Sequence, residues 1–396
     1  MSVDTATFPE HLRLQVYGDA SELGNAWRAF EKNAFGTLFQ SYAWVSAWCD
    51  AAAAARGETP VIAVWYEPEG SIAAIWPMAM SGPSGSRVLT WLGQGYTNYN
   101  MGLYRTDVAQ RIDASALNRM IEQLSLSLPC ATALQLVDQP SVWNGRPNPF
   151  AALPQQPSAN VAFEMPLLTD PDELFRKALS KDTRRRLERH ERRLHEMHQA
   201  EFAVAQTQDM RLETLSAFLQ QRAAQFERMG VSNIFADPAI ADFYRILFTQ
   251  QTGAHFESAY LKIDGEIIAT SNGMRFQDRF YHLTLSKTLD VLENISPGRL
   301  LSREHVARQC RDGIAMFDFG PGGGMHKSTW HPNEISYFET YLPLRRSAIP
   351  IALLRRTLAG CRYAALSSPA IQRAIKLAKS SKMELVRRVR NARIRK

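Results

Sequence analysis

Cysteine is scarce in this chain. Only Cys49, Cys130, Cys310 and Cys361 occur among 396 residues, and none forms a C-x-x-C pair. Cysteines this far apart suit neither a disulfide framework nor a thiolate zinc site, so we expect a reducing compartment.

Long apolar runs are absent as well. No apolar run approaches the roughly 18–20 residues of a membrane-spanning helix. The N-terminal stretch MSVDTATFPEHLRLQVYG lacks the basic and apolar regions of a signal peptide. We therefore predict a cytoplasmic protein.

Nucleotide-binding motifs are also missing, although the stretch DFGPGGGMHKS (318–328) resembles two of them. A P-loop needs glycine directly before its lysine, and His326 stands there. A kinase needs an H-R-D loop and a strand lysine upstream of Asp-Phe-Gly, and neither is present. These differences exclude both motifs.

The positive charge is confined to one end of the chain. Residues 345–396 hold 15 basic residues and one acid, Glu384, whereas the whole chain has a net charge of +7. The other 344 residues therefore sum to about −7. A body of this charge is not a general nucleic-acid binder, and we expect no DNA partner.

A weak internal repeat indicates two domains of mixed α/β type. Each half is expected to have a helix (41–55; 238–251), a strand hairpin (60–66 and 71–80; 257–263 and 266–276) and a third strand (87–93; 279–286). A further helix (114–128; 298–311) and strand (132–138; 313–320) follow. The Asp264-Gly265 pair between apolar runs is the stronger hairpin signal.

The domain boundaries are expected at 1–165 for the first domain, 166–345 for the second and 346–396 for a basic helical tail. Five prolines between Pro147 and Pro166 predict a linker region. A long charged helix is expected over residues 171–198, before the second hairpin.

One helix start has the features of an anion-binding site. In the stretch 294–310, Ser296 is expected to cap a helix, and Pro297 stands where an N–H is not needed. Gly298 would let a ligand approach the backbone, and free amides at a helix start bind phosphate well. An ordinary capped helix is the alternative interpretation.

Two side chains of neighbouring strands are candidates for the same crevice. Alternation places His282 on one face of strand 279–286, and Asp318 ends the following strand. If these strands are neighbours, both residues lie beside the Ser-Pro-Gly helix start.

The order and spacing of several short motifs resemble the CelD/BcsL group of the GNAT acyltransferase superfamily. The resemblance covers about residues 35–345 and implies two tandem GNAT-like domains. It rests on residues 37–51, residues 175–194, Tyr281-His282-Leu283, Ser296-Pro297-Gly298-x-Leu300-Leu301, Asp318-Phe319-Gly320, Lys327 and Trp330.

The resemblance implies acyl-CoA as co-substrate, with no permanently bound cofactor. The pyrophosphate of acyl-CoA would lie on the helix start formed by Ser296, Pro297, Gly298, Arg299 and Leu300. The backbone amides of Gly298, Arg299 and Leu300 would hold it. This chain departs from the superfamily's [QR]-x-x-G-x-[GA] loop, because it reads Asn-Ile-Ser-Pro-Gly-Arg over residues 294–299.

The resemblance also implies direct acyl transfer to an amine or hydroxyl. A backbone N–H of the splayed strand would bind the thioester oxygen. His282 and Asp318 are the candidate bases, and Lys327 is a candidate for stabilising charge or orienting the acceptor. On this basis Asp318→Asn is predicted to cut turnover at least tenfold without loss of folding. Alternatives for the three residues are a buried strand histidine, a turn cap and a solvated lysine.

The charged helix offers candidate contacts to the acceptor. In the FemABX peptidyltransferases, which share the paired-domain plan, a basic helix at this position meets acceptor phosphates. Lys181 and Arg184 are therefore candidate substrate-binding residues, although a solvated helix with internal ion pairs is the alternative. His190, His195 and His198 are spaced poorly for metal ligation, and no metal site is expected.

The tail suggests a membrane surface as partner. Residues 371–394 form a basic amphipathic pattern suited to the anionic inner face of the inner membrane. A helix packed on the body and a disordered tail are the alternatives.

We expect an acyltransferase acting on a cell-envelope polysaccharide or lipid precursor, with the loop 93–100 shaping the acceptor cleft. The rival hypotheses are a long-chain N-acyltransferase on a lipid amine such as a sphingoid base, a FemABX-like transferase using aminoacyl-tRNA, and a scaffold of a polysaccharide synthase complex.

Overall fold

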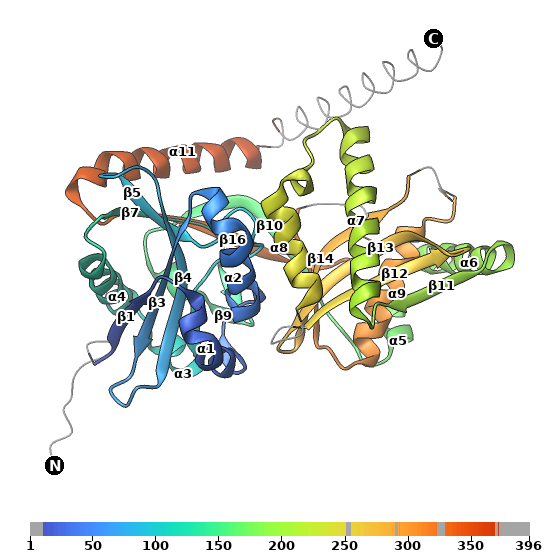
Figure 1. Ribbon diagram of the computed structural model, residues 1–396, viewed down its shortest axis with the longest axis horizontal. Coiled ribbons are helices and arrows are strands. Elements are labelled where there is room, and N and C mark those ends of the chain that lie inside the picture. The colour runs from blue at the N-terminus through green and yellow to red at the C-terminus, as the bar shows by residue number, and fades with distance from the viewer. Residues whose placement is uncertain are drawn as a thin grey trace, which may run out of the picture.

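The computed structural model describes residues 11–250, 255–289, 292, 294–322, 329–368 and 371. Within these residues fourteen strands form one mixed sheet that runs through both halves of the molecule. Helices cover both faces of this sheet (Figure 1). The predicted class, mixed α/β with two GNAT-like halves and a C-terminal helix, is confirmed.

The first half follows the predicted order closely. The predicted helix 41–55 begins as α2 (Tyr42–Trp48) and continues through a π-helical turn at Cys49–Ala53. Its elements are β1 (Arg13–Tyr17), α1 (Gly24–Glu31), β2 (Ala34–Phe35), α2 (Tyr42–Trp48), β3 (Thr59–Tyr66), β4 (Ile72–Ser81), β5 (Arg87–Trp91), β6 (Leu103–Arg105), α3 (Thr106–Arg111), α4 (Ala114–Ser127), β7 (Ala131–Pro140), β8 (Val142–Trp143) and β9 (Arg146–Pro147).

The second half adds a long helix, α7, that the sequence analysis did not predict. The predicted Asp264-Gly265 turn joins β12 to β13, and both residues have positive φ (52° and 91°), as a tight hairpin requires. The elements are β10 (Gln156–Pro166), α5 (Pro171–Ala178), α6 (Lys181–Met197), β11 (Ala200–Val204), α7 (Gln208–Met229), α8 (Pro238–Thr249), β12 (His255–Ile263), β13 (Glu266–Phe276), β14 (Arg279–Lys287), α9 (Pro297–Arg311), β15 (Met316–Pro321), β16 (Asn333–Pro343) and α11 (Ile349–Ser367).

Local capping decides where several helices begin. Ser180 accepts a hydrogen bond from Thr183 N and starts α6, so the predicted single helix 171–198 is wrong and consists of α5 and α6. Thr207 caps α7 through Met210 N, and Gly230 ends it at φ 63°.

The predicted linker at 147–166 is also wrong in its second part, because Gln156–Pro166 forms β10 inside the sheet. Its prolines fit because Pro157 stands next to a break in register with β16, and Pro166 is the last residue of the strand. Proline is tolerated at bulges and strand ends, where no ladder hydrogen bond is lost.

The two halves exchange their last strands. β10 follows the first half in sequence but pairs with β15 of the second, whereas β16 ends the second half and pairs with β7 of the first. β10 and β16 pair with each other at the centre of the sheet. The boundaries 1–165, 166–345 and 346–396 stay a prediction, and the exchange means that neither half completes its sheet from consecutive residues.

Two hydrophobic cores hold the helices on the sheet. The larger core crosses between the halves, where Trp44 of α2 packs edge-on against Phe243 of α8 with ring centroids 5.0 Å apart. Figure 1 shows α8 beside α2, with α7 alongside. The smaller core lies on the other face of the second half, under α5, α6 and α9. The predicted tail helix 371–394 lies outside the described residues, apart from Ile371.

Candidate active site

Two parallel strands open into a V at the centre of the second half. β14 and β15 pair from Arg279–Met316 to Tyr281–Asp318, and no further pair joins these two fully described strands. α9 connects them along the chain. The two strands are therefore parallel neighbours, which is the condition under which the sequence analysis places His282 and Asp318 beside the Ser-Pro-Gly helix start.

A β-bulge lies at the opening of this V. β13 pairs Asn272 with Thr284 and then Gly273 with His282, so Leu283 has no partner on that strand. A bulge leaves backbone groups of the extra residue outside the ladder. Gly273 is needed opposite the bulge, because a Cβ there would lie 2.5 Å from Tyr281 O.

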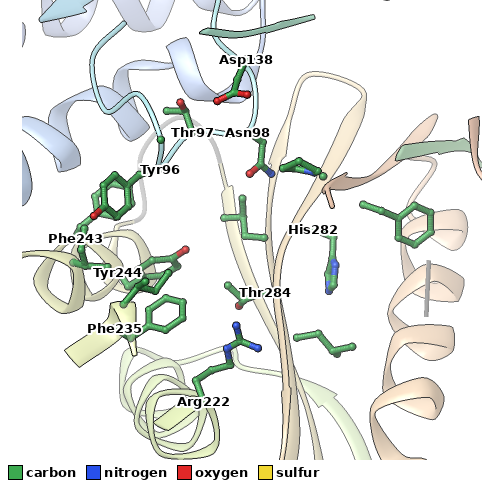
Figure 2. A pocket seen from close by; sticks show the side chains of 18 of the residues that line it. Tyr96, Thr97, Asn98, Asp138, Arg222, Phe235, Phe243, Tyr244, His282 and Thr284 are labelled. Atoms are coloured by element: carbon green, nitrogen blue, oxygen red, sulfur yellow. The ribbon is translucent and has the colours of Figure 1, made fainter. Parts of the chain in front are cut away.

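A cavity of about 450 Å³ occupies the junction between the V and the first half. Figure 2 shows Asp138 at one end, Arg222 at the other, and His282 across the strand from Thr284. Loop 93–100, which the sequence analysis expects to shape an acceptor cleft, contributes Gly95, Tyr96, Thr97 and Asn98 to the lining. The polar side chains of the lining belong to Tyr96, Thr97, Asn98, Asp138, Asn160, Arg222, Tyr244, His282, Thr284 and Tyr337.

His282 reaches this cavity but its side chain is largely buried, with 6% exposed. Its Nε2 lies 3.1 Å from Ser271 Oγ on β13. Its ring also packs against Phe317, with centroids 5.7 Å apart. The predicted base is therefore held in one orientation beside the bulge.

Asp318 lies on the opposite face of the sheet from His282. Its neighbours Phe317 and Phe319 pack in the smaller core with Phe280, whereas Asp318 faces Tyr99 and Arg279. It is fully buried and does not line the cavity. The structure therefore does not bring the two candidate bases into one crevice, because alternate residues of a strand point to opposite faces.

The surroundings of Asp318 form a polar junction between the halves. Its Oδ1 accepts hydrogen bonds from Tyr99 Oη (3.0 Å) and Gly320 N (2.7 Å). Arg279 lies 3.5 Å from its Oδ2 and 2.5 Å from Glu164. Burial raises the pKa of the Asp318 carboxyl to about 6, against the lowering effects of Arg279 and the two hydrogen bonds.

The start of α9 differs from the predicted anion cradle. Ser296 occupies the N-cap position with φ 57°, and its side chain makes no capping hydrogen bond. Pro297 stands at the first helical position, as predicted. The amides of Arg299 and Leu300 both donate to Ser296 O, at 2.9 and 3.3 Å. Of the three amides proposed as cradle, only Gly298 N has no backbone hydrogen bond among the described residues.

Gly298 nevertheless lies close to the V. A Cβ at Gly298 would meet Leu285 at 4.0 Å, and Leu285 lines the cavity. The helix start is therefore adjacent to the cavity wall on the α9 side.

The remaining predicted residues lie elsewhere. Lys181 is exposed at the start of α6, and Arg184 lines a different hollow between α5, α6 and α9. This hollow shares no lining residue with the cavity at the V. Lys327 lies outside the described residues.

Arg222 and Asp138 are cavity residues that the sequence analysis missed. Arg222 comes from α7, and no carboxylate of the described chain pairs with it; its Nη1 donates to Gln225 Oε1 at 3.0 Å. Burial lowers the pKa of Arg222 from its ordinary value. Asp138 has φ 53° and accepts a hydrogen bond from Asn160, and burial raises its pKa. No local motif marks either residue, since each stands alone in its element.

The parallel strands β14 and β15, which splay beside a bulge and are joined by α9, give this half a GNAT-like fold. Residues 181–328 match the family described as an acetyltransferase (GNAT) domain. GNAT domains use acyl-CoA as co-substrate, so the match supports a transferase. No curated protein sequence matches the chain significantly.

Solved structures share this fold over most of the chain. The chain resembles FemX with a TM-score of 0.59 at 12% identity, covering 87% of this chain and 100% of FemX. A conserved protein of unknown function from Bacteroides thetaiotaomicron has a TM-score of 0.55 at 12% identity, and the match covers 83% of this chain and 100% of that protein. L-PGS from Bacillus licheniformis has a TM-score of 0.50 at 12% identity, and the match covers 87% of this chain and 98% of L-PGS. At these identities the likeness concerns the fold alone.

Within the described part of the chain, no group of three or more His, Cys, Asp or Glu side chains could hold a metal ion. No described helix is both long and apolar enough to cross a membrane.

Proposed function

We propose that this chain is an acyltransferase of the CelD/BcsL type that moves an acyl group from acyl-CoA to an amine or hydroxyl of a cell-envelope polysaccharide or lipid precursor. One observation carries this proposal: the parallel strands β14 and β15 splay at a bulge that lines a cavity between the halves. The pantetheine arm would enter between the splayed strands. The acceptor would approach from loop 93–100 and α7.

The bulge suits the developing oxyanion, because Leu283 has no partner residue on β13. An N–H at Leu283 or Thr284 would donate to the thioester oxygen as the acceptor attacks the carbonyl carbon. His282 is the proposed base, because it reaches the cavity beside the bulge. For Asp318 we propose a different role, the anchoring of the two halves, because its side chain is buried away from the cavity.

Arg222 supports a substrate with an acidic group. Its guanidinium lies at the cavity wall, and its buried Nε has no hydrogen-bond partner in the described chain. An arginine in this state binds carboxylate or phosphate oxygens well. We propose that it contacts a phosphate or carboxylate of the donor or acceptor.

α11 supports action at a membrane surface. Ile351, Leu354 and Leu358 recur at spacings of three and four, and each is at least half exposed. Arg355 and Arg362 flank this stripe. Apolar side chains with flanking arginines suit the anionic inner face of a membrane.

A FemABX-like transferase that uses aminoacyl-tRNA is the second candidate. The observation that favours it is the α9 start, where Ser296 O occupies two of the amides expected to bind the CoA pyrophosphate. Acyl-CoA would then lack part of its usual phosphate cradle.

Isothermal titration calorimetry of the purified chain separates these candidates. We expect saturable binding of acyl-CoA, with an affinity that depends on chain length, and no binding of aminoacyl-tRNA. Binding of aminoacyl-tRNA without acyl-CoA would establish the second candidate. Binding of neither, together with no co-purified CoA in a native mass spectrum, would favour a scaffold.

A further inference from the structure

Four buried side chains form a continuous hydrogen-bonded chain that ends at His282. Glu257 Oε1 on β12 lies 2.9 Å from His305 Nε2 on α9. His305 Nδ1 lies 2.8 Å from Ser271 Oγ, which lies 3.1 Å from His282 Nε2. Of the four, only His282 lines the cavity. Polar chains of this length are costly to bury unless every member is paired.

The Glu257 end of the chain is ionised. Burial alone would raise the pKa of this carboxyl, but the hydrogen bond from His305 and the charges of Arg275 and Arg308 lower it to about 2. Arg275 Nη2 donates to Oε2 at 2.8 Å. An ionised carboxylate only accepts hydrogen bonds, so His305 Nε2 carries a hydrogen.

The directions of the other two bonds follow from this. Arg275 and Arg308 together balance the charges of Glu257 and Asp312, which suits a neutral His305 in this fully buried position. A neutral imidazole that donates through Nε2 accepts through Nδ1, so Ser271 donates its hydroxyl hydrogen to His305. Ser271 Oγ then accepts from His282, and His282 carries its hydrogen on Nε2.

We infer that Glu257, His305 and Ser271 are positioning residues that hold His282 in the Nε2–H form and so make Nδ1 its proton-accepting nitrogen. This inference rests on the acyl transfer proposed above. The relay occupies Nε2, and Nδ1 is the ring nitrogen outside it.

The chemical step follows directly. The acceptor nitrogen or oxygen forms a bond to the thioester carbonyl carbon and gives its proton to His282 Nδ1. The carbon–sulfur bond then breaks, and the CoA thiolate leaves with the electron pair. His282 returns its proton to the thiolate or to solvent. While His282 carries this proton, the ionised Glu257 at the far end of the relay stabilises its positive charge, as a buried carboxylate does for the histidine of a serine hydrolase.

A spectroscopic test reads the tautomer without substrate. In the full-length protein with ¹⁵N-labelled histidine, the signals lost in His282→Gln identify His282. We expect the wild type to show Nε2–H and an unprotonated Nδ1. In Ser271→Ala we expect the two tautomers to mix, and in Ser271→Thr, which keeps the hydroxyl, the Nε2–H form to persist. Finding Nδ1–H in the wild type, or no change in Ser271→Ala, would overturn the inference.

Ser286→Ala is the matched control. Ser286 is an equally buried hydroxyl of the same sheet, bonded to Thr270 and Gln221 on the other face and outside the cavity lining. The Ser286→Ala variant should leave the ¹⁵N signals of His282 unchanged. A shift of the same size in this variant would indicate a general packing effect and would also overturn the inference.

A kinetic measurement adds the catalytic consequence. We expect Ser271→Ala to lower kcat at least about tenfold, a part of the roughly 10²–10⁴-fold that a general base contributes, with the KM for acyl-CoA unchanged. Ser271→Thr should restore most of the rate. An unchanged kcat in Ser271→Ala would contradict the positioning role. If the wild type transfers no acyl group, the proposed function fails, while the tautomer result still decides the hydrogen-bond relay.

Discussion

Tyr99 Oη donates a 3.0 Å hydrogen bond to Asp318 Oδ1, which joins the two halves of the molecule across 219 positions of sequence. Both residues are fully buried. Arg279, on the same face, stacks over Trp143 of the first half at 4.2 Å and bonds Asn144. The carboxylate that resembles a catalytic group from its motif is therefore part of the junction on which the cavity depends.

This burial predicts a pH dependence of stability. The unfolded Asp318 ionises near 3.8 and the folded one near 6, so between these values the folded chain holds a proton that the unfolded chain has lost. Raising the pH from about 4 to about 6 should lower the free energy of unfolding by up to ~3 kcal/mol, with no further loss above. Denaturant unfolding of the wild type and Asp318→Asn across this range measures it. The stability difference between the two should change over that window; a constant difference would contradict the burial argument.

His282→Gln should lower kcat by roughly 10²–10⁴-fold, the usual contribution of a general base. Glutamine keeps a polar side chain next to Ser271, so the far-UV circular dichroism should stay that of the wild type. Turnover is measured by release of free thiol from acyl-CoA. Asp318→Asn, compared in the same assay, distinguishes the two candidate bases: a rate within about threefold of the wild type supports an anchoring role, and a loss of tenfold or more supports the catalytic role predicted from the sequence.

Arg222→Met should raise the KM of the substrate that carries the acidic group by about 10–100-fold. This range corresponds to the ~1.5–3 kcal/mol of a charged hydrogen bond. Arg228→Met, an exposed arginine near the end of the same helix, is the control and should leave KM unchanged. Equal KM values in both variants would exclude Arg222 from substrate binding.

Two glycines of the site should respond differently to alanine. Gly273→Ala places a Cβ 2.3 Å from Phe280 Cζ and 2.5 Å from Tyr281 O, so we expect a loss of ~1–3 kcal/mol of stability through overpacking at the bulge. Gly298→Ala meets its nearest neighbour at 4.0 Å and should keep the wild-type melting temperature. If the pyrophosphate lies against this helix start, Gly298→Ala weakens acyl-CoA binding in calorimetry. Unchanged binding would remove Gly298 from the donor site.

The stripe on α11 predicts membrane attachment that point variants can test. Leu354→Ser with Leu358→Ser should reduce flotation of the full-length protein with vesicles containing anionic lipid, because both side chains are 58% exposed and their loss costs the core little. Leu126→Ser, at 72% exposed on α4, is the matched control. Equal flotation of the double variant and this control would contradict the role of α11.

The local patterns predicted well what depends on neighbouring residues. The hairpin at Asp264-Gly265 and the proline at the start of α9 follow from spacing and turn chemistry, whereas the parallel order of β14 and β15 is implied by the family resemblance. The break at Ser180 and the strand at 156–166 were missed. In the first case a cap interrupts an otherwise helical pattern, and in the second prolines at a bulge and a strand end imitate a linker.

The candidate site likewise has features that follow from local sequence and features that depend on tertiary packing. The sequence by itself determined that His282, Ser296-Pro297-Gly298 and Asp318 belong to two strands and the helix that joins them along the chain, because strand and helix periodicity are local properties. Only the tertiary structure decided which of them meet. The bulge at Leu283 and the alternation along β15 direct His282 toward α9 and Asp318 toward the first half. Arg222, Tyr99 and the Glu257–His305–Ser271 relay come together through packing of distant segments, and one sequence carries no local signal of such contacts.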